Sequence, residues 1–129
     1  MNSRTLEVPA TAVSDATELV IVQESESKTG GVIWDAALVL EAFIRKTAKS
    51  APHLFDGKYL PVLKNATVLD LGTGTGFMGL SFLPYRCKNI ILTDLPTELG
   101  LAHKNIDLNQ KVISARATSV EARAFDWTD

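Results

Sequence analysis

The sequence predicts an α/β fold built on a parallel sheet. Two apolar runs, at residues 66–71 and 90–94, are typical of buried strands, and each is followed by apolar residues at helical spacing. The first run leads directly into the glycine-rich stretch 72–76. Strands that alternate with helices form a parallel sheet with right-handed crossovers, and ligands bind at the carboxyl ends of its strands. The glycine-rich stretch lies at that end.

The composition is that of one globular domain. The chain has 129 residues, of which 46% are hydrophobic and 22% are charged, and its mean hydropathy is +0.10. Lys and Arg number 13 against 15 Asp and Glu, which gives a net charge of −2. The sequence has no run of basic residues, which proteins that hold nucleic acid or an anionic membrane use. We therefore expect neither as a partner.

A disulfide within the chain is excluded, because Cys87 is the single cysteine. Neither His has a second ligand at metal spacing, so we expect no metal site. The N-terminus has no apolar stretch of signal-peptide length, and the longest apolar segment, 32–44, is interrupted by Asp35 and Glu41. These features predict a cytoplasmic or nuclear protein in a reducing compartment.

The N-terminal third contains a strand and a helix. Residues 1–18 mix Ser, Thr, Ala and Pro with scattered charge, so we expect a poorly ordered segment before the domain at 19–129. Residues 19–23 are a short β-branched run, which predicts an edge strand. Over residues 33–48 the apolar spacing predicts an amphipathic helix with one buried face, made of Ile33, Ala36, Ala37, Leu40, Phe43 and Ile44.

The remaining elements follow from breakers and periodicity. Proline and glycine residues interrupt 52–61 before the buried strand at 66–71. A short helix after the glycines ends at Pro84, and a second helix occupies 96–109, with a proline in its first turn. Apolar and charged residues alternate near the C-terminus, which predicts a third strand over 120–125.

The stretch 72–76, Gly-Thr-Gly-Thr-Gly, predicts a nucleotide-like cofactor, because a Cβ on a glycine of such a loop would occupy the ligand's space. A dinucleotide site needs a small residue at position 77, where this chain has Phe77, and no Gly-Lys-Ser/Thr of a P-loop follows. Asp94 comes 20 residues after Gly74, where its carboxylate can accept hydrogen bonds from ribose hydroxyls. NAD enzymes share such an acid, so Asp94 alone does not discriminate.

Five short segments, in order along the chain, resemble the motifs of one enzyme family. They are 30–37 (GGVIWDAA), 68–76 (VLDLGTGTG), 93–96 (TDLP), 105–109 (NIDLN) and 126–127 (DW). The second segment resembles the first motif of S-adenosylmethionine-dependent methyltransferases with a Rossmann-like sheet. Together the segments resemble family 16, the methyltransferase-like 21 group of the seven-β-strand class, whose members methylate lysines on proteins.

The resemblance implies a set of cofactor-binding residues. They are Trp34, Gly72, Thr73, Gly74, Asp94 and Trp127. The glycine loop would face the methionine end of S-adenosylmethionine, Asp94 would bind the ribose, and Trp127 would lie near the adenine, where its ring can stack. Trp34 would contact the cofactor from the preceding helix, and Asp70 would orient the loop. A core position for Trp34 and a surface position for Trp127 are the alternatives.

The function that the resemblance implies is methyl transfer from S-adenosylmethionine to a lysine of a protein substrate. Family members continue into a further strand whose acidic and aromatic residues line the lysine entry, whereas this chain ends at Asp129. We therefore expect a truncated domain, the N-terminal half of a class I methyltransferase sheet, and assign no catalytic residue. A small-molecule acceptor, a catalytically incompetent cofactor-binding or interaction module, and an NAD-binding domain stay open as alternatives.

Several polar residues are expected to be structural. Asn105 and Asn109 are predicted to bond to backbone groups or to cap the end of the helix. His103 is predicted on the solvated side of the same helix, since no ligand or catalytic partner lies at a suitable spacing. Cys87 follows the end of a helix and is predicted to behave as a small buried hydrophobe.

Overall fold

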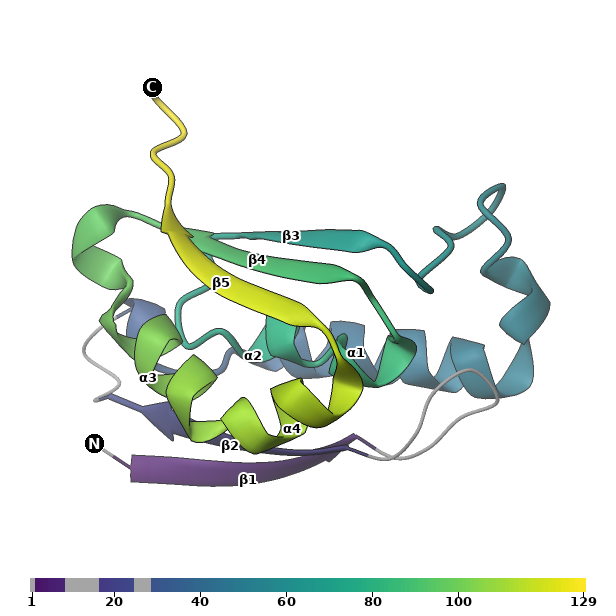
Figure 1. Ribbon diagram of the computed structural model, residues 1–129, viewed down its shortest axis with the longest axis horizontal. Coiled ribbons are helices and arrows are strands. Elements are labelled where there is room, and N and C mark those ends of the chain that lie inside the picture. The colour runs from purple at the N-terminus through teal and green to yellow at the C-terminus, as the bar shows by residue number, and fades with distance from the viewer. Residues whose placement is uncertain (1, 9–16, 25–28) are drawn as a thin grey trace.

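The structure is a computed structural model that describes residues 2–8, 17–24 and 29–129. It has three layers: a parallel sheet, a layer of helices beneath it, and an antiparallel hairpin below the helices (Figure 1). The last residues of the chain extend away from the helices, beyond the sheet (Figure 1). The predicted α/β class with a parallel sheet is confirmed.

The parallel sheet has three strands, in the order β3 (Thr67–Leu71), β4 (Asn89–Asp94) and β5 (Ser119–Ala124). Leu69 pairs with Ile91, and Ile91 pairs with Glu121, so these side chains share one face of the sheet. The opposite face points toward the helices. The prediction of a buried strand is wrong for β3: the face toward the helices is only partly buried, and on the other face Leu69 is 57% exposed and Leu71 is 52% exposed.

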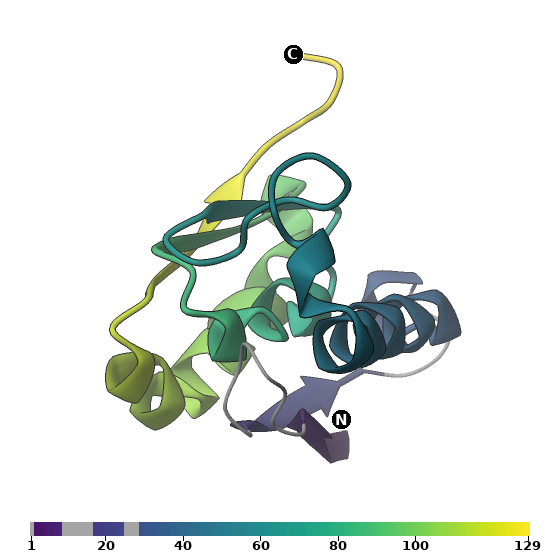
Figure 2. The same cartoon turned by 90° about the vertical axis from the view of Figure 1, so that its right-hand side faces the viewer.

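The α-helices all lie on one side of this sheet (Figure 2). They are α1 (Asp35–Ser50), α2 (Phe77–Leu80), α3 (Gly100–Leu108) and α4 (Gln110–Arg116). Ile90 and Leu92 point from the centre of the sheet into the helical layer and are fully buried there. The helix α4 was not predicted from the sequence, although its Ile113 reaches the core.

The buried face of α1 differs from the predicted one. Ala37, Ile44 and Ala48 pack on the core, whereas Leu40 and Phe43 are exposed. The buried side also carries an ion pair within the helix, in which Arg45 Nε donates to Glu41 Oε1 at 3.0 Å. Because nearly every side of α1 contains apolar residues, the apolar spacing did not indicate which side would face the core.

The N-terminal hairpin pairs β1 (Asn2–Val8) with β2 (Thr17–Gln23) in antiparallel register. The sequence predicted a poorly ordered segment over 1–18, whereas the structure has a strand at Asn2–Val8; residues 9–16 lie outside the described residues. The backbone of β1 is ordered by its ladder with β2, and Leu6 packs against the core. The predicted strand at 19–23 is confirmed, and its Leu19 and Ile21 are fully buried.

No helix in the described ranges has both the length and the apolar character needed to cross a membrane. Within the same ranges, no group of three or more His, Cys, Asp or Glu side chains is placed to hold a metal ion. Cys87 is buried, as predicted, and burial raises the pKa of its thiol to about 11.

Candidate functional site

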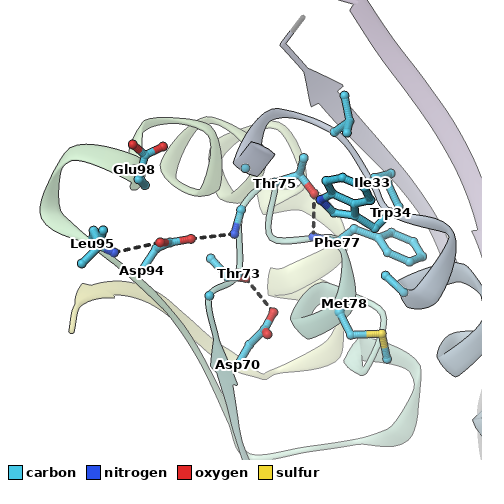
Figure 3. A pocket seen from close by; sticks show the side chains of 15 residues that line it. Ile33, Trp34, Asp70, Thr73, Thr75, Phe77, Met78, Asp94, Leu95 and Glu98 are labelled. Carbon is cyan, nitrogen blue, oxygen red and sulfur yellow. Dashed lines mark hydrogen bonds between the residues drawn. The ribbon is translucent and has the colours of Figure 1, made fainter. Parts of the chain in front are cut away.

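A cavity of about 620 Å³ opens at the carboxyl ends of β3 and β4. One wall is the glycine loop between β3 and α2, and the facing wall is the segment that leads into α1, with Gly30, Ile33 and Trp34 (Figure 3). The segment after β4 adds Leu95 and Glu98. The size is within the range of cavities that bind small ligands, and the position is where parallel α/β sheets bind them.

The glycine loop touches the facing wall at Gly74. This residue has a positive φ of 55°, and a Cβ on it would lie 2.9 Å from the carbonyl oxygen of Gly30. Any other residue would therefore be strained in its backbone and would also push the two walls apart. The loop is anchored to the sheet as well, since the amide of Thr73 donates to the carbonyl oxygen of Thr93 at 2.8 Å.

Asp94, at the end of β4, points its carboxylate at the glycine loop (Figure 3). Its Oδ2 accepts a hydrogen bond from the Gly74 amide at 2.9 Å, and its Oδ1 accepts one from the Leu95 amide at 2.8 Å. Gly74 and Asp94, which are 20 residues apart in the sequence, are thus in direct contact. A carboxylate held in this way presents its remaining lone pairs to the cavity.

Asp70, near the end of β3, ties the loop to α2. Its Oδ2 accepts hydrogen bonds from the Thr73 hydroxyl at 2.6 Å and from the Gly79 amide at 3.1 Å. Burial raises the pKa of this carboxyl; the two hydrogen bonds oppose the shift, and the nearby charge of Asp94 adds to it. These contacts fit the predicted role of orienting the loop.

The two tryptophans lie in different places. Trp34 is 58% exposed and lines the main cavity just ahead of α1. Trp127 is 69% exposed and lines a smaller cavity of about 290 Å³, which shares Gly72, Asp94 and Leu95 with the main one. Neither tryptophan is a core residue. All six predicted site residues therefore line one of two adjoining cavities that meet at Gly72 and Asp94.

Sequence reasoning did not assign a site role to Glu98 or Gly30, which both line the main cavity. Glu98 lies in a separate 3₁₀ turn, Pro96–Glu98, so the predicted helix over 96–109 is wrong in its first turn. A Cβ on Gly30 would lie 3.8 Å from Glu98 Oε2, so the turn and the wall before α1 come together there. The pair Gly30-Gly31 was the available signal, because adjacent glycines mark close backbone approaches as well as turns.

The main cavity is strongly acidic. Asp70, Asp94 and Glu98 line it, and no Lys, Arg or His belongs to the part of its lining that the structure describes. The Gly74 amide, a typical phosphate donor, is bonded to Asp94. This chemistry favours a ligand that has hydroxyl groups and positive charge over one that has a pyrophosphate.

Comparison with known proteins identifies the family. Residues 13–129 match a family described as lysine methyltransferase. Protein-lysine N-methyltransferase rrg1 of Schizosaccharomyces pombe is 33% identical over 84 residues, which are 64% of this chain and 28% of that relative. The chain thus spans about 28% of the length of this curated relative. Because the family match covers nearly all of the chain, including the whole cavity, this chain belongs to the lysine methyltransferase family.

Proposed function

We propose that the main cavity binds S-adenosylmethionine and that the protein uses it to methylate a lysine of a protein substrate. The observation that carries this proposal is the acidic lining around a glycine loop, with Asp70, Asp94 and Glu98. S-adenosylmethionine carries a sulfonium and an ammonium group against one carboxylate, so its net charge is positive. Opposite charges attract more strongly in a partly desolvated cavity than in water, which supports this cofactor over a dinucleotide.

The residues present fit the parts of this cofactor. The glycine loop provides a surface free of side chains beside Asp70, and the carboxylate of Asp94 is a natural acceptor for two ribose hydroxyls. The smaller cavity, with Trp127 and Phe125, has an apolar and aromatic lining that suits an adenine ring. Trp34 closes the main cavity from the side opposite the loop.

Methyl transfer from this cofactor requires the protein mainly to bind and orient the reacting groups. When bound, S-adenosylmethionine would supply a methyl group on positively charged sulfur, which is already reactive toward an amine. Asp70, Asp94 and the glycine loop would fix the position of that methyl group, and the apolar side chains of Trp34 and Met78 would exclude water from it. An acceptor lysine must be neutral to react and has an ordinary pKa of about 10.4. We assign no base for its proton among the described residues.

Protein lysine as the acceptor is supported by the family and by the name of the yeast relative. We also propose a cytoplasmic or nuclear location, which the single buried cysteine supports, since such a thiol cannot form a disulfide within the chain.

Calorimetric titration of the chain with S-adenosylhomocysteine, the stable product form of the cofactor, tests the binding site. We expect saturable one-to-one binding, and at least about tenfold weaker binding for Asp94→Ala, which loses the proposed ribose ligand. Asp107→Ala is the matched control, because it removes the same carboxylate at an exposed position on α3. Absence of binding by a folded, monodisperse sample would overturn the proposal.

Transfer is tested with S-adenosylmethionine labelled in its methyl group and a mixture of protein acceptors. Methyl-lysine in the acid hydrolysate of the proteins would support the proposed acceptor. Label that appears only on small amines would point to a small-molecule methyltransferase instead. Tight cofactor binding with no transfer to either class of acceptor would identify a cofactor-binding module without activity of its own.

A further inference from the structure

The two walls of the main cavity come from distant parts of the chain, and something must set the distance between them. The glycine loop follows β3, whereas the wall with Ile33 and Trp34 lies before α1. The walls touch where the Gly30 carbonyl meets Gly74, a contact without side chains. A single van der Waals contact of this kind contributes little attraction, so the distance between the two walls depends on hydrogen bonds elsewhere.

Asn105 of α3 reaches from β2 to the glycine loop. It is fully buried, and its Nδ2 donates to the carbonyl oxygen of Thr75 at 2.7 Å. The same amide pairs with Val22 of β2, since Nδ2 donates to the Val22 carbonyl at 3.1 Å and Oδ1 accepts from the Val22 amide at 2.7 Å. Three of the four hydrogen-bonding capacities of this side chain, both N–H donors and one lone pair of Oδ1, thus serve backbone groups.

The end of β2 holds the other wall. The amide of Ile33 donates to Gln23 Oε1 at 2.9 Å, and the amide of Glu24 donates to the carbonyl oxygen of Gly31 at 2.7 Å. Gln23 and Glu24 directly follow Val22 in the chain. Hydrogen bonds and the covalent link from Val22 to Gln23 therefore connect the glycine loop, through Asn105 and β2, to Ile33, the neighbour of Trp34.

Asn109, which caps the C-terminus of α3 one turn after Asn105, provides an internal comparison. Its Oδ1 accepts from the Val20 amide at 3.0 Å and its Nδ2 donates to the Val20 carbonyl at 2.8 Å. The two asparagines thus bond to the edge of β2 as a neighbouring strand would. Nδ2 of Asn109 also donates to the Asn105 carbonyl, at 2.7 Å, so the side chain of Asn109 bonds to β2 and α3 and not to the glycine loop. Both residues stabilise the fold, and Asn105 alone also joins the cavity walls.

We propose that Asn105 is a positioning residue that holds the glycine loop at the spacing the cofactor needs, by coupling the loop to the wall before α1. This inference rests on the proposed function only for the identity of the ligand. Without the Asn105 hydrogen bonds, the loop adopts other positions as well. Part of the free energy of cofactor binding must then be used to order the loop, so the affinity falls. We expect Asn105→Ala to weaken binding of S-adenosylhomocysteine about tenfold, beyond any change seen for Asn109→Ala.

Hydrogen exchange of the chain without ligand tests the coupling independently of activity and of cofactor. In Asn105→Ala, the amides of Gly74 and Gly76 should exchange faster relative to the Leu92 amide in the sheet core, which reports global stability. In Asn109→Ala, the loop and core amides should change together. If Asn105→Ala does not fold, Gln23→Met tests the other end, since it removes the acceptor of the Ile33 amide and keeps the side-chain volume.

Equal effects of Asn105→Ala and Asn109→Ala on loop exchange, measured against the core, would overturn the proposal. So would a Gln23→Met variant with unchanged exchange at Ile33 and unchanged affinity. If the unaltered chain binds no S-adenosylhomocysteine, the proposed function fails, while the exchange measurement still decides whether Asn105 couples the walls. Faster exchange of the loop amides relative to the core in Asn105→Ala, together with the expected loss of affinity, would support the proposed role of Asn105.

Discussion

At the scale of single residues, Asp70 shows a conflict between stability and the proposed cofactor binding. Its carboxylate is partly buried beside α2, and that burial, rather than the charge of Asp94, is the main cause of its raised pKa. The folded chain therefore binds this proton more tightly than the unfolded chain does. It follows that the contribution of Asp70 to stability is greatest below the unfolded pKa, near 3.8, and is lost as the pH rises through the raised folded value.

Asp70→Asn removes this conflict. The amide oxygen can accept the hydrogen bonds from Thr73 and Gly79 that Oδ2 accepts now, while the group no longer ionises. At neutral pH, we expect the free energy of unfolding of the variant, measured with urea, to equal or exceed that of the parent. The variant's advantage in free energy of unfolding should grow as the pH rises through the acidic range, because only the parent then ionises at this position. Its affinity for the cationic S-adenosylmethionine should fall, by about tenfold, because one negative charge leaves the cavity.

The exposed residue Asp107 on α3 offers the control for this substitution, since Asp107→Asn changes the same charge far from any burial. An Asp70→Asn variant that is less stable than the parent at neutral pH would contradict the argument. It would mean that the hydrogen bonds to Asp70 depend on the full carboxylate charge.

Only some of the site residues could be predicted from sequence alone. Gly74 and Asp94 follow from a local rule, because a glycine loop after one strand and an acid at the tip of the next must meet in a parallel sheet. Gly30 and Glu98 line the same cavity through tertiary contacts between segments far apart in sequence, and no local spacing encodes those. The bridging role of Asn105 was unpredictable for the same reason, although bonding to backbone was expected of it.

At the scale of elements, the contact between α2 and the sheet depends on Gly79. A Cβ on this residue would overlap Leu92 Cδ2 and lie 3.2 Å from Asp70 Oδ2. Since Leu92 is fully buried, its side chain has little room to move. The helix must therefore shift away from β4 if Gly79 gains a side chain.

We predict that Gly79→Ala lowers the free energy of unfolding by about 1–3 kcal/mol, the usual cost of overpacking a core. Urea denaturation followed by circular dichroism measures this. Gly100→Ala is the matched control, because Gly100 begins α3 and a Cβ there would have nothing within 4 Å. We expect that control to leave stability unchanged or slightly raised, since alanine favours helix. Equal losses in the two variants would disprove close packing of α2 on the sheet.

Elements with strong internal patterns were predictable, and those that depend on partners were not. The strands β3 and β4 and the helix α1 have clear apolar patterns and were confirmed close to their predicted bounds. The strand β1 has a mostly polar sequence, and the ladder with β2 orders its backbone. Which side of α1 faces the core could not be predicted either, because the apolar spacing predicts a helix but several of its sides are apolar.

At the scale of the whole molecule, the described residues cover the sheet on one side only. The helices pack beneath it, and no α-helix of the described ranges lies on the other face (Figure 2). That face is charged on β5, where Arg123 and Glu121 form an ion pair, and apolar on β3, where Leu69 and Leu71 are exposed. Within the described residues β3 pairs with β4 alone, so its other edge keeps unpaired backbone groups.

An exposed apolar face beside an open strand edge favours association between copies of this chain. We predict that the chain associates in a concentration-dependent way in sedimentation velocity, and that Leu69→Lys weakens the association about tenfold or more. A lysine there places a charge that must be desolvated on association, while the β3–β4 pairing stays intact. Glu121→Lys tests whether any added positive charge suffices, because Glu121 lies on the same face in register with Leu69. If Leu69→Lys associates as the parent does, the contact lies elsewhere, and the exposed side of α1 with Phe43 becomes the surface to alter next.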